Sequence, residues 1–308
     1  MQDRNYGDLF TLSSSLIGTV TLAVDECKQL ASLINRRFQQ AFDESPVWPR
    51  YLVVSEKRKI ISLLVSGSTS PSVVNQYYYD SGELENGHTK YLGATDPVYK
   101  IVKNTEGTQW FLKNSGGTSF YETASSTTVV GHPWEDLTWS AVGTGNGTLV
   151  VEDKTNLIPY AETGLTSIGD FNRIHRNQAF KNLSRIEYDF FVNLDGASIL
   201  DVVSSTDNAV YVTYKKQFST LDPSLSDPVV ANDYYGNTAV KVPAEFFNFI
   251  AHSVYADFLR IQNKQEEALA EETRAQTYLA QELEKIDIRS NNNTVNQRFS
   301  TYVNRQAR

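Results

Sequence analysis

Few residues of this 308-residue chain have the type and spacing that catalysis or metal binding requires. The single cysteine, Cys27, falls on the apolar side of a helical repeat, where a free cysteine is usually a small buried side chain. Successive histidines are more than forty residues apart and none has the spacing of a ligand pair: His88, His132, His175 and His252. We therefore predict structural roles for Cys27 and the histidines, with no catalytic residue, metal or cofactor.

The acidic pairs Glu266-Glu267 and Glu271-Glu272 are the remaining candidates for acid–base chemistry. Both lie on the polar side of a helical repeat, where water is expected to solvate them, whereas catalytic carboxyl groups need perturbed surroundings. The glycine-rich segment 143–147 lies between strand-like runs, without the helix that a phosphate-binding loop uses. These patterns favour a protein that is not an enzyme.

Basic and aromatic clusters are candidates for binding surfaces. Arg36-Arg37 and the basic segment 57–59 are candidate phosphate contacts, but the formal net charge of −8 favours solvated charges at the ends of helices or strands. The tyrosines at 77–79 could stack on bases or sugars. In a β region, such rings more often fill a sheet face or a subunit interface.

Helices at both ends of the chain must position these side chains. From 23 to 43, apolar residues recur at intervals that place them on one helical face: Cys27, Leu30, Leu33, Ile34, Phe38, Ala41 and Phe42. Ser45-Pro46 ends this helix. A shorter helix is expected over 6–18, with Gly18 at its C-terminal side.

A helical repeat returns after Val242, and Pro243 occupies a first-turn position. Its apolar face comprises Phe247, Ile250, Val254, Phe258 and Ile261. After an interruption at 263–265, a second apolar face follows: Ala268, Ala275, Leu279, Leu283 and Ile286. The pattern predicts a helical hairpin bent at Asn263 that packs on the helix 23–43, with one long helix as the alternative.

Between these ends, short runs rich in valine, tyrosine, phenylalanine and threonine alternate with glycine-containing turns, which is typical of antiparallel β structure. The clearest strands are 209–218 and 185–193, which we expect in one sheet, and 98–103 with 108–113 is predicted to be a hairpin. The fold class is therefore α+β: a helical module built from the N-terminal helices and a C-terminal helical hairpin, with a large antiparallel β region, sandwich or barrel-like, inserted between them.

Four segments follow from these patterns: 1–59 (N-terminal helical part), 60–241 (inserted β region of one or two subdomains), 242–287 (C-terminal hairpin) and 288–308 (tail). The tail carries four arginines and no acid after Asp287. We predict that it is flexible alone and docks on a partner, with a frayed terminus as the alternative. The expected docking residues are Arg289, Arg298, Phe299, Tyr302, Arg305 and Arg308.

No apolar run reaches the roughly 18 residues that a bilayer span needs. The N-terminus also lacks the basic-then-apolar pattern of a secretory signal. We therefore expect a soluble protein that contacts no membrane.

Short motifs at both ends resemble tailed-phage head-to-tail connector proteins of the adaptor or neck type. Near the N-terminus, the helix with Asn35-Arg36-Arg37 runs into Trp48-Pro49-Arg50, as in that group. At the other end, 242–246 begins a helical hairpin and the acidic helix 265–287 completes it. Segments 158–162 and 168–170, followed by a β region ending at 209–214, look similar too. A tryptophan common in the first of these helices is replaced by Phe38 or Phe42, and residues 60–150 match nothing in the group.

The resemblance implies a structural virion protein without a cofactor. It implies a homo-oligomeric ring, twelve-fold by the family pattern, between the portal protein and a downstream tail or nozzle protein. Double-stranded DNA would pass through the ring without sequence-specific binding. The protein would assemble in the host cytoplasm and reside in the virion neck, and Arg36, Arg37 and Trp48 become candidate contacts within the ring.

Two other classes of function compete with this interpretation. A tail-tip or adhesin module would bind a carbohydrate through the tyrosine-rich β region. A hydrolase of polysaccharide or peptidoglycan would need a deep pocket with two facing carboxylates.

Overall fold

The computed structural model describes residues 3–19, 22–135, 137–178, 186–200, 209–221 and 232–306, with side chains up to Ile286. It has the predicted α+β fold, because helices from both ends of the chain flank a large antiparallel β region in the sequence. The chain forms two compact units. The helical unit contains Met1–Tyr51 and Phe218–Arg308, and the β unit contains Leu52–Gln217.

The boundaries of the β unit differ from the expected 60–241. The unit begins at Leu52 because strand β2 (Leu52–Lys59) already pairs with β14 (Ala209–Lys216). It ends at Gln217 because the residues that follow contribute Leu221 and Tyr234 to the core of the helical unit.

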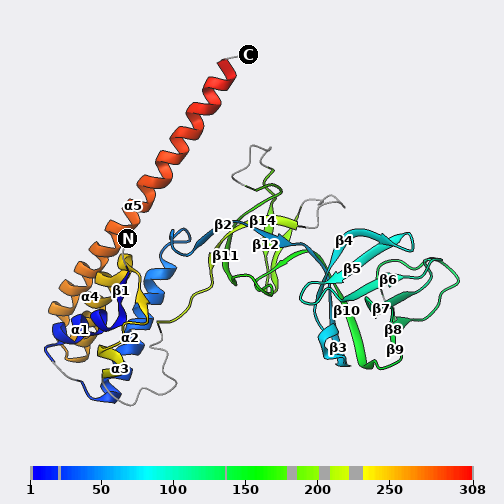
Figure 1. Cartoon of the computed structure of the whole chain (residues 1–308). Coiled ribbons are helices and arrows are strands. Elements are labelled where there is room, and N and C mark those ends of the chain that lie inside the picture. Colours follow the sequence, from blue (N-terminus) through cyan, green and yellow to red (C-terminus); the bar gives the residue numbers. More distant parts are fainter. Residues whose placement is uncertain are drawn as a thin grey trace. The chain divides into compact units, whose positions relative to one another are not determined.

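The helical unit is formed mainly by helices from the two ends of the chain, and Figure 1 shows the blue N-terminal helices beside the yellow and orange C-terminal ones. Two short strands, β1 (Arg4–Asn5) and β15 (Lys241–Val242), pair antiparallel and also join these ends. The helices are α1 (Tyr6–Ile17), α2 (Val24–Asp43), α3 (Asn232–Tyr235), α4 (Ala244–Ile261) and α5 (Gln265–Gln306).

Local sequence explains where α1 and α2 begin and end. The Asp8 carboxylate accepts the Asn5 N–H at the start of α1, and the Glu26 carboxylate accepts the Ala23 N–H at the start of α2, at 2.9 Å. Gly18 ends α1 with a φ of 86°, which glycine adopts without steric cost. Both predicted N-terminal helices are confirmed.

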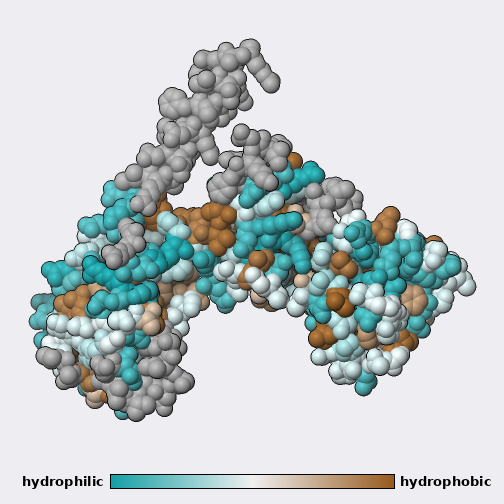
Figure 2. Space-filling view, viewed as in Figure 1, coloured by the Kyte–Doolittle hydropathy of each residue, from teal (hydrophilic) through white to brown (hydrophobic). Residues whose placement is uncertain are grey.

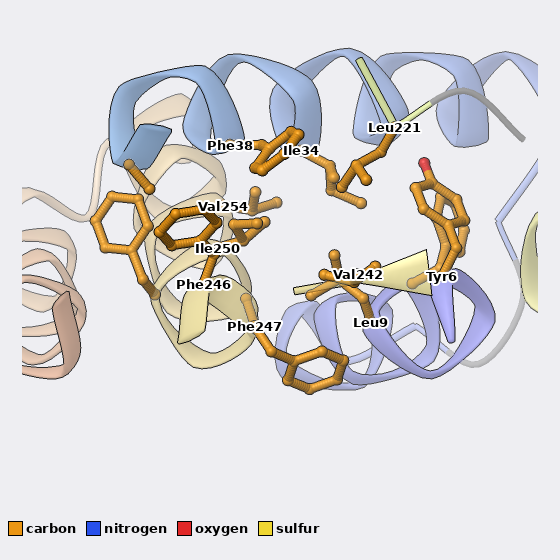
Figure 3. Close-up of a cluster of buried hydrophobic side chains, with 14 of the residues drawn as sticks. Tyr6, Leu9, Ile34, Phe38, Leu221, Val242, Phe246, Phe247, Ile250 and Val254 are labelled. Atoms are coloured by element: carbon orange, nitrogen blue, oxygen red, sulfur yellow. The ribbon is translucent and has the colours of Figure 1, made fainter. Parts of the chain in front are cut away.

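The core of the helical unit lies between α1, α2, α4 and α5 (Figure 3). Ile34 and Phe38 of α2 face α4, where the rings of Phe38 and Phe246 lie 5.7 Å apart. Each aliphatic or aromatic side chain fully buried in this way contributes about 1.5 to 3 kcal/mol. The buried residues include Leu9, Phe10, Cys27, Leu30, Ile34, Phe38, Phe246, Ile250, Val254, Ala275 and Leu279.

The C-terminal helices form the predicted hairpin. α4 ends at Ile261 and α5 begins at Gln265, and between them Asn263 adopts a φ of 61°, a conformation that asparagine tolerates better than most residues. One expectation is wrong: Ile261 was assigned to the apolar face of α4, but it is 70 % exposed because the helix ends there.

The β unit contains a ten-stranded antiparallel sheet, in the order β12-β13-β10-β3-β4-β5-β6-β7-β8-β9, and a three-stranded sheet, in the order β11-β14-β2. Besides β2 and β14, the strands are β3 (Ile61–Ser70), β4 (Tyr77–Glu85), β5 (His88–Gly93), β6 (Tyr99–Lys103), β7 (Trp110–Asn114), β8 (Ser119–Thr123), β9 (Trp139–Ala141), β10 (Asn146–Pro159), β11 (Ile168–His175), β12 (Phe190–Val192) and β13 (Gly196–Ile199).

Two separate hydrophobic cores lie inside the β unit. The first is surrounded by β3 to β9 and the start of β10. There the Tyr121 hydroxyl of β8 lies 2.8 Å from Ser68 Oγ of β3, so the sheet curls back on itself. The second core lies between the three-stranded sheet and β12, β13 and the end of β10. β10 reaches both, with Leu149 in the first core and Ile158 in the second.

The strand predictions have mixed outcomes. The hairpin of β6 and β7 is confirmed, and β14 buries Val210, Val212 and Tyr214 on one face as expected. The expectation that 185–193 shares a sheet with 209–218 is wrong, because β12 pairs with β13 in the other sheet. The expected strand 185–193 is divided between the two sheets. Glu187 forms a bridge to β11 of the three-stranded sheet, whereas Phe190 pairs with Ile199 of β13 in the ten-stranded sheet.

Among the described residues, no helix has the length and apolar character needed to cross a bilayer.

Candidate functional site

The candidate site is built around the Trp48-Pro49-Arg50 turn. This turn follows α2 in the chain, and its side chains contact both the end of α2 and α4. The Trp48 indole N–H donates to the carbonyls of Ala41 and Phe42 at 3.0 and 3.1 Å. These carbonyls belong to the last turn of α2, where a helix in general needs hydrogen-bond donors from outside its own backbone. The Trp48 ring also meets the edge of Phe246 at 4.7 Å, so one side chain both caps α2 and packs on α4.

Arg50, at the end of this turn, holds two segments that are distant in sequence. Its guanidinium donates to Asp3 near the N-terminus at 3.0 Å and to Glu245 at the start of α4 at 3.2 Å. The hydrogen bonds from Arg50 lower the pKa of Asp3. The start of the chain is therefore bound to the α2–α4 junction.

A cavity of about 240 Å³ lies where this turn meets α5. Trp48, Pro49 and Ile286 supply its apolar lining. Its charged lining comprises Arg50, Glu245, Glu282 and Lys285. The charges are paired, Arg50 with Glu245 and Lys285 with Glu282, the latter at 2.5 Å. Such a cavity can admit an apolar side chain with a polar surround.

A buried ion network joins α2, α4 and α5 on another part of the unit. The Arg37 guanidinium donates to Asp257 at 2.5 and 2.8 Å and to Glu272 at 2.9 and 3.0 Å. The side chains of Arg37 and Asp257 are each 7 % exposed. Arg36 and Arg260 also contact Asp257, at 2.6 and 3.1 Å, so the network links all three helices through charge-assisted hydrogen bonds.

The ion network keeps the Asp257 carboxyl group ionised. Burial alone would raise the pKa of Asp257, but the hydrogen bonds and charges of Arg37 and Arg36 outweigh burial and hold this pKa below its usual value. Asp257 is therefore ionised at neutral pH and serves to hold the helices together.

The three residues expected to make ring contacts differ in exposure within the subunit. Arg37 is buried in the ion network and Trp48 is 1 % exposed, and their role in ring contacts stays a prediction. Arg36, with a side chain 62 % exposed, is still accessible for a ring contact. The difference in exposure between Arg36 and Arg37 was not apparent from the sequence. The two residues are adjacent, but their side chains leave α2 in different directions.

The acidic pair 271–272 is also less solvated than expected. Glu272 binds Arg37, and Glu271 lies 2.8 Å from the His252 ring nitrogen Nδ1. Each of these two carboxyl side chains is 17 % exposed. Both therefore fasten α5 to its neighbouring helices, Glu272 through its ion pair with Arg37 and Glu271 through its contact with His252.

Comparisons of the chain with models of protein families, with curated proteins and with solved structures gave no significant match.

The expected docking tail coincides with the end of a helix. α5 continues to Gln306, rather than ending near residue 287 as the segment boundaries implied. The side chains of Arg289, Arg298, Phe299, Tyr302 and Arg305, and all of Arg308, lie outside the described residues, so their docking role stays a prediction.

The residues considered for catalysis are dispersed. Cys27 is buried, and burial raises the pKa of its thiol. Its Sγ lies 3.8 Å from the Leu22 carbonyl oxygen. In the described part of the chain, no three His, Cys, Asp or Glu side chains are grouped closely enough to hold a metal ion.

Sequence reasoning missed the burial of Arg58. This side chain, expected to be solvated or to bind phosphate, is 0 % exposed and contacts Glu56 at 2.6 Å and the Tyr214 hydroxyl at 2.7 Å. Simple alternation along β2 gave no signal, because its buried positions, Ser55 and Arg58, lie three apart where the pairing with β14 is irregular. Of the tyrosines at 77–79, Tyr78 is fully buried and Lys59 lies over the Tyr79 ring at 4.6 Å.

Proposed function

We propose that the chain is a structural virion protein that forms an oligomeric ring between the portal vertex of a phage capsid and the tail. In this proposal the ring contacts the portal protein on one side and a tail or nozzle protein on the other. It lines the channel through which double-stranded DNA passes. The protein acts by assembly and has no enzymatic role.

The length of α5 is the observation that carries this proposal. α5 has 42 residues and its hairpin partner α4 has 18. At 1.5 Å per residue these helices measure about 63 and 27 Å, so α5, which runs back along α4 in the hairpin, continues well beyond the start of α4. A helix of this length can carry the arginine-rich end of the chain to a neighbouring protein (Figure 1).

The charge of the chain is consistent with a DNA channel. Its formal net charge is −8, and charges of one sign on a channel wall and on phosphates repel. A wall that attracted phosphates would slow the passing DNA. The proposed ring therefore needs no sequence-specific contact with DNA.

The carbohydrate-binding alternative is less favoured by the same structure. A sugar-binding face needs exposed aromatic rings, but Tyr78 is buried and Lys59 covers a face of Tyr79.

Mass measurement on the full chain tests the proposal. The purified protein should be measured alone and after mixing with the portal protein of the same phage. We expect a complex containing several copies of the chain per portal ring. A chain that shows no binding to the portal ring, or that instead binds one glycan class on an array with saturation, would contradict the proposal.

A matched pair of variants identifies the surface involved. Deleting 288–308 removes the uncompensated arginines, whereas Lys113→Gln removes a positive charge from the β unit. We expect portal binding to weaken only in the deletion variant. Equal portal binding by both variants would mean that the tail does not dock there.

A further inference from the structure

The chain contains two Asn-Gly pairs, and the structure treats them differently. Asn146-Gly147 begins β10, and Asn86-Gly87 joins β4 to β5. When the backbone nitrogen after an asparagine attacks the side-chain amide carbon, a five-membered ring forms and the asparagine deamidates. Glycine hinders this attack least, because it has no side chain. Both asparagines are exposed, so neither the sequence nor solvent access distinguishes the two pairs.

At Asn146 the two reacting groups already lie together. The Gly147 N–H donates to the Asn146 side-chain oxygen Oδ1 at 2.8 Å. The amide carbon Cγ is bonded to that oxygen, so the nitrogen lies beside the carbon that it would attack. Holding a nucleophile next to its target removes much of the entropic cost of a reaction.

The backbone around Gly147 departs from a regular strand. The pairing of β10 with β3 shifts register on both sides of Gly147, and an interrupted ladder restrains the local backbone less than a continuous one. The φ of Gly147 is 102°, and a Cβ there would collide with the carbonyl oxygen of Gly67. The fold therefore requires glycine at the position where glycine also permits ring closure.

The side chain of Asn86 is held by another strand. Its amide nitrogen Nδ2 donates to the carbonyl of Lys103 on β6 at 2.8 Å. Ring closure at Asn86 must release this nitrogen as ammonia, and so must break this hydrogen bond. The fold thus protects one Asn-Gly pair and pre-organises the other.

We infer that Asn146 is a site of spontaneous deamidation in the folded protein. The Gly147 nitrogen loses its proton and bonds to Asn146 Cγ, and the Cγ–Nδ2 bond breaks as the amide nitrogen takes up a proton and leaves as ammonia. Water then opens the cyclic imide at either carbonyl, which gives aspartate or iso-aspartate at this position. The reaction needs only water, and the inference does not depend on the ring proposed above.

The iso-aspartate product alters the closure of the first β core. The buried Tyr121 hydroxyl donates to the main-chain carbonyl of Asn146 and lies 2.8 Å from Ser68 Oγ. In iso-aspartate this carbonyl becomes a free carboxylate, and the main chain continues through the side-chain carbon with one more CH₂ group. The longer main chain shifts Gly147 against the backbone of β3, so the start of β10 pairs less tightly with its neighbours.

Peptide mapping by mass spectrometry after incubation of the full chain at mildly alkaline pH tests the inference. Deamidation raises the mass of a peptide by replacing an amide with an acid, and iso-aspartate elutes apart from aspartate. In folded protein we expect Asn146 to deamidate at least about tenfold faster than Asn86, which corresponds to about 1.4 kcal/mol in activation free energy. In urea-unfolded protein the two rates should be similar, because both pairs are then equally free.

A rate at Asn146 that does not exceed the rate at Asn86 in folded protein would overturn the inference. An equal ratio of the two rates in folded and unfolded protein would overturn it too, since the difference would then come from local sequence. Asn146→Gln should abolish the fast gain of negative charge on anion exchange, and the matched control Asn86→Gln should retain it. Loss of this gain in Asn86→Gln alone would assign the reaction to the other pair and reject the inference.

Hydrogen exchange on fractions separated by anion exchange tests the effect on the fold. We expect the iso-aspartate fraction to exchange the amides of β8 and of residues 146–151 faster than unmodified protein. Asn146→Asp leaves the main chain unchanged, so it should exchange these amides like wild type. Equal exchange in all three samples would reject the loosening of the start of β10.

Discussion

Removing Arg37 should destabilise the helical unit strongly. Arg37→Met keeps much of the side-chain length but leaves Asp257 and Glu272 without the guanidinium that bonds to both. Breaking a buried ion pair from one side costs about 3 to 5 kcal/mol. Arg260 lies 3.1 and 3.2 Å from the two carboxylates and can partly replace Arg37, so we expect the lower part of that range, about 3 kcal/mol.

Urea unfolding monitored at 222 nm measures this effect, because α1 to α5 all lie in the helical unit. The double variant Arg37→Met with Asp257→Leu should recover at least about 2 kcal/mol, since an apolar pair then replaces a buried carboxylate that has lost its buried cation. A loss below about 1 kcal/mol in Arg37→Met would refute the view that this network fastens the helices. A double variant no more stable than the single one would refute the unpaired-charge explanation.

Acid should weaken the same network. The pKa of Asp257 is lowered in the folded state, so its stabilising contribution is complete above the unfolded value near 3.9 and is lost as pH falls through the folded pKa. We expect the helical unit of wild type to lose stability below about pH 4 more steeply than Asp257→Asn. Parallel pH curves for the two proteins would contradict the assigned ionisation of Asp257.

Three further predictions concern other parts of the helical unit. Phe38→Ala should lower the free energy of unfolding by about 3 to 5 kcal/mol, because the ring is 2 % exposed; a loss under about 1 kcal/mol would contradict its place in the core. Phe258 is half-buried, so Phe258→Ala should cost less in the same assay. Cys27→Ser should lower stability while portal assembly of the folded protein is unchanged, and fast labelling of the native thiol would contradict its burial.

The helices were predictable because their apolar residues repeat over several turns. The stripe that includes Cys27, Ile34 and Phe38 matches the buried face of α2, and the break at Asn263 marks the hairpin. Exposure of Ile261 was not predictable from the same repeat, because periodicity assigns a face but does not show where the neighbouring helices end.

The candidate site was only partly predictable. Its motif, Trp48-Pro49-Arg50, was identified, but its cavity depends on Glu245 and Ile286, which meet the motif only through tertiary packing. The carboxylate partners of Arg37 lie more than 200 residues away in sequence, so no local pattern could indicate them. In the β region, the switch of residues 186–192 between two sheets depends on long-range pairing rather than on alternation.

The register of β2 and β14 affects how the helical unit can fold. Leu52 and Lys215 are direct partners in that pair, so the two ends of the β unit emerge side by side. Without that pairing, bringing α2 to α4 would require closing a loop of about 200 residues; with it, the connecting chain outside the β unit is only about 34 residues long. At about 0.6 kcal/mol per doubling of loop length, the difference is about 1.5 kcal/mol of chain entropy. The inserted β unit thus lowers the entropic cost of bringing together the helices from both ends of the chain. If it folds early during synthesis, it would also reduce the time that these helices need to find each other.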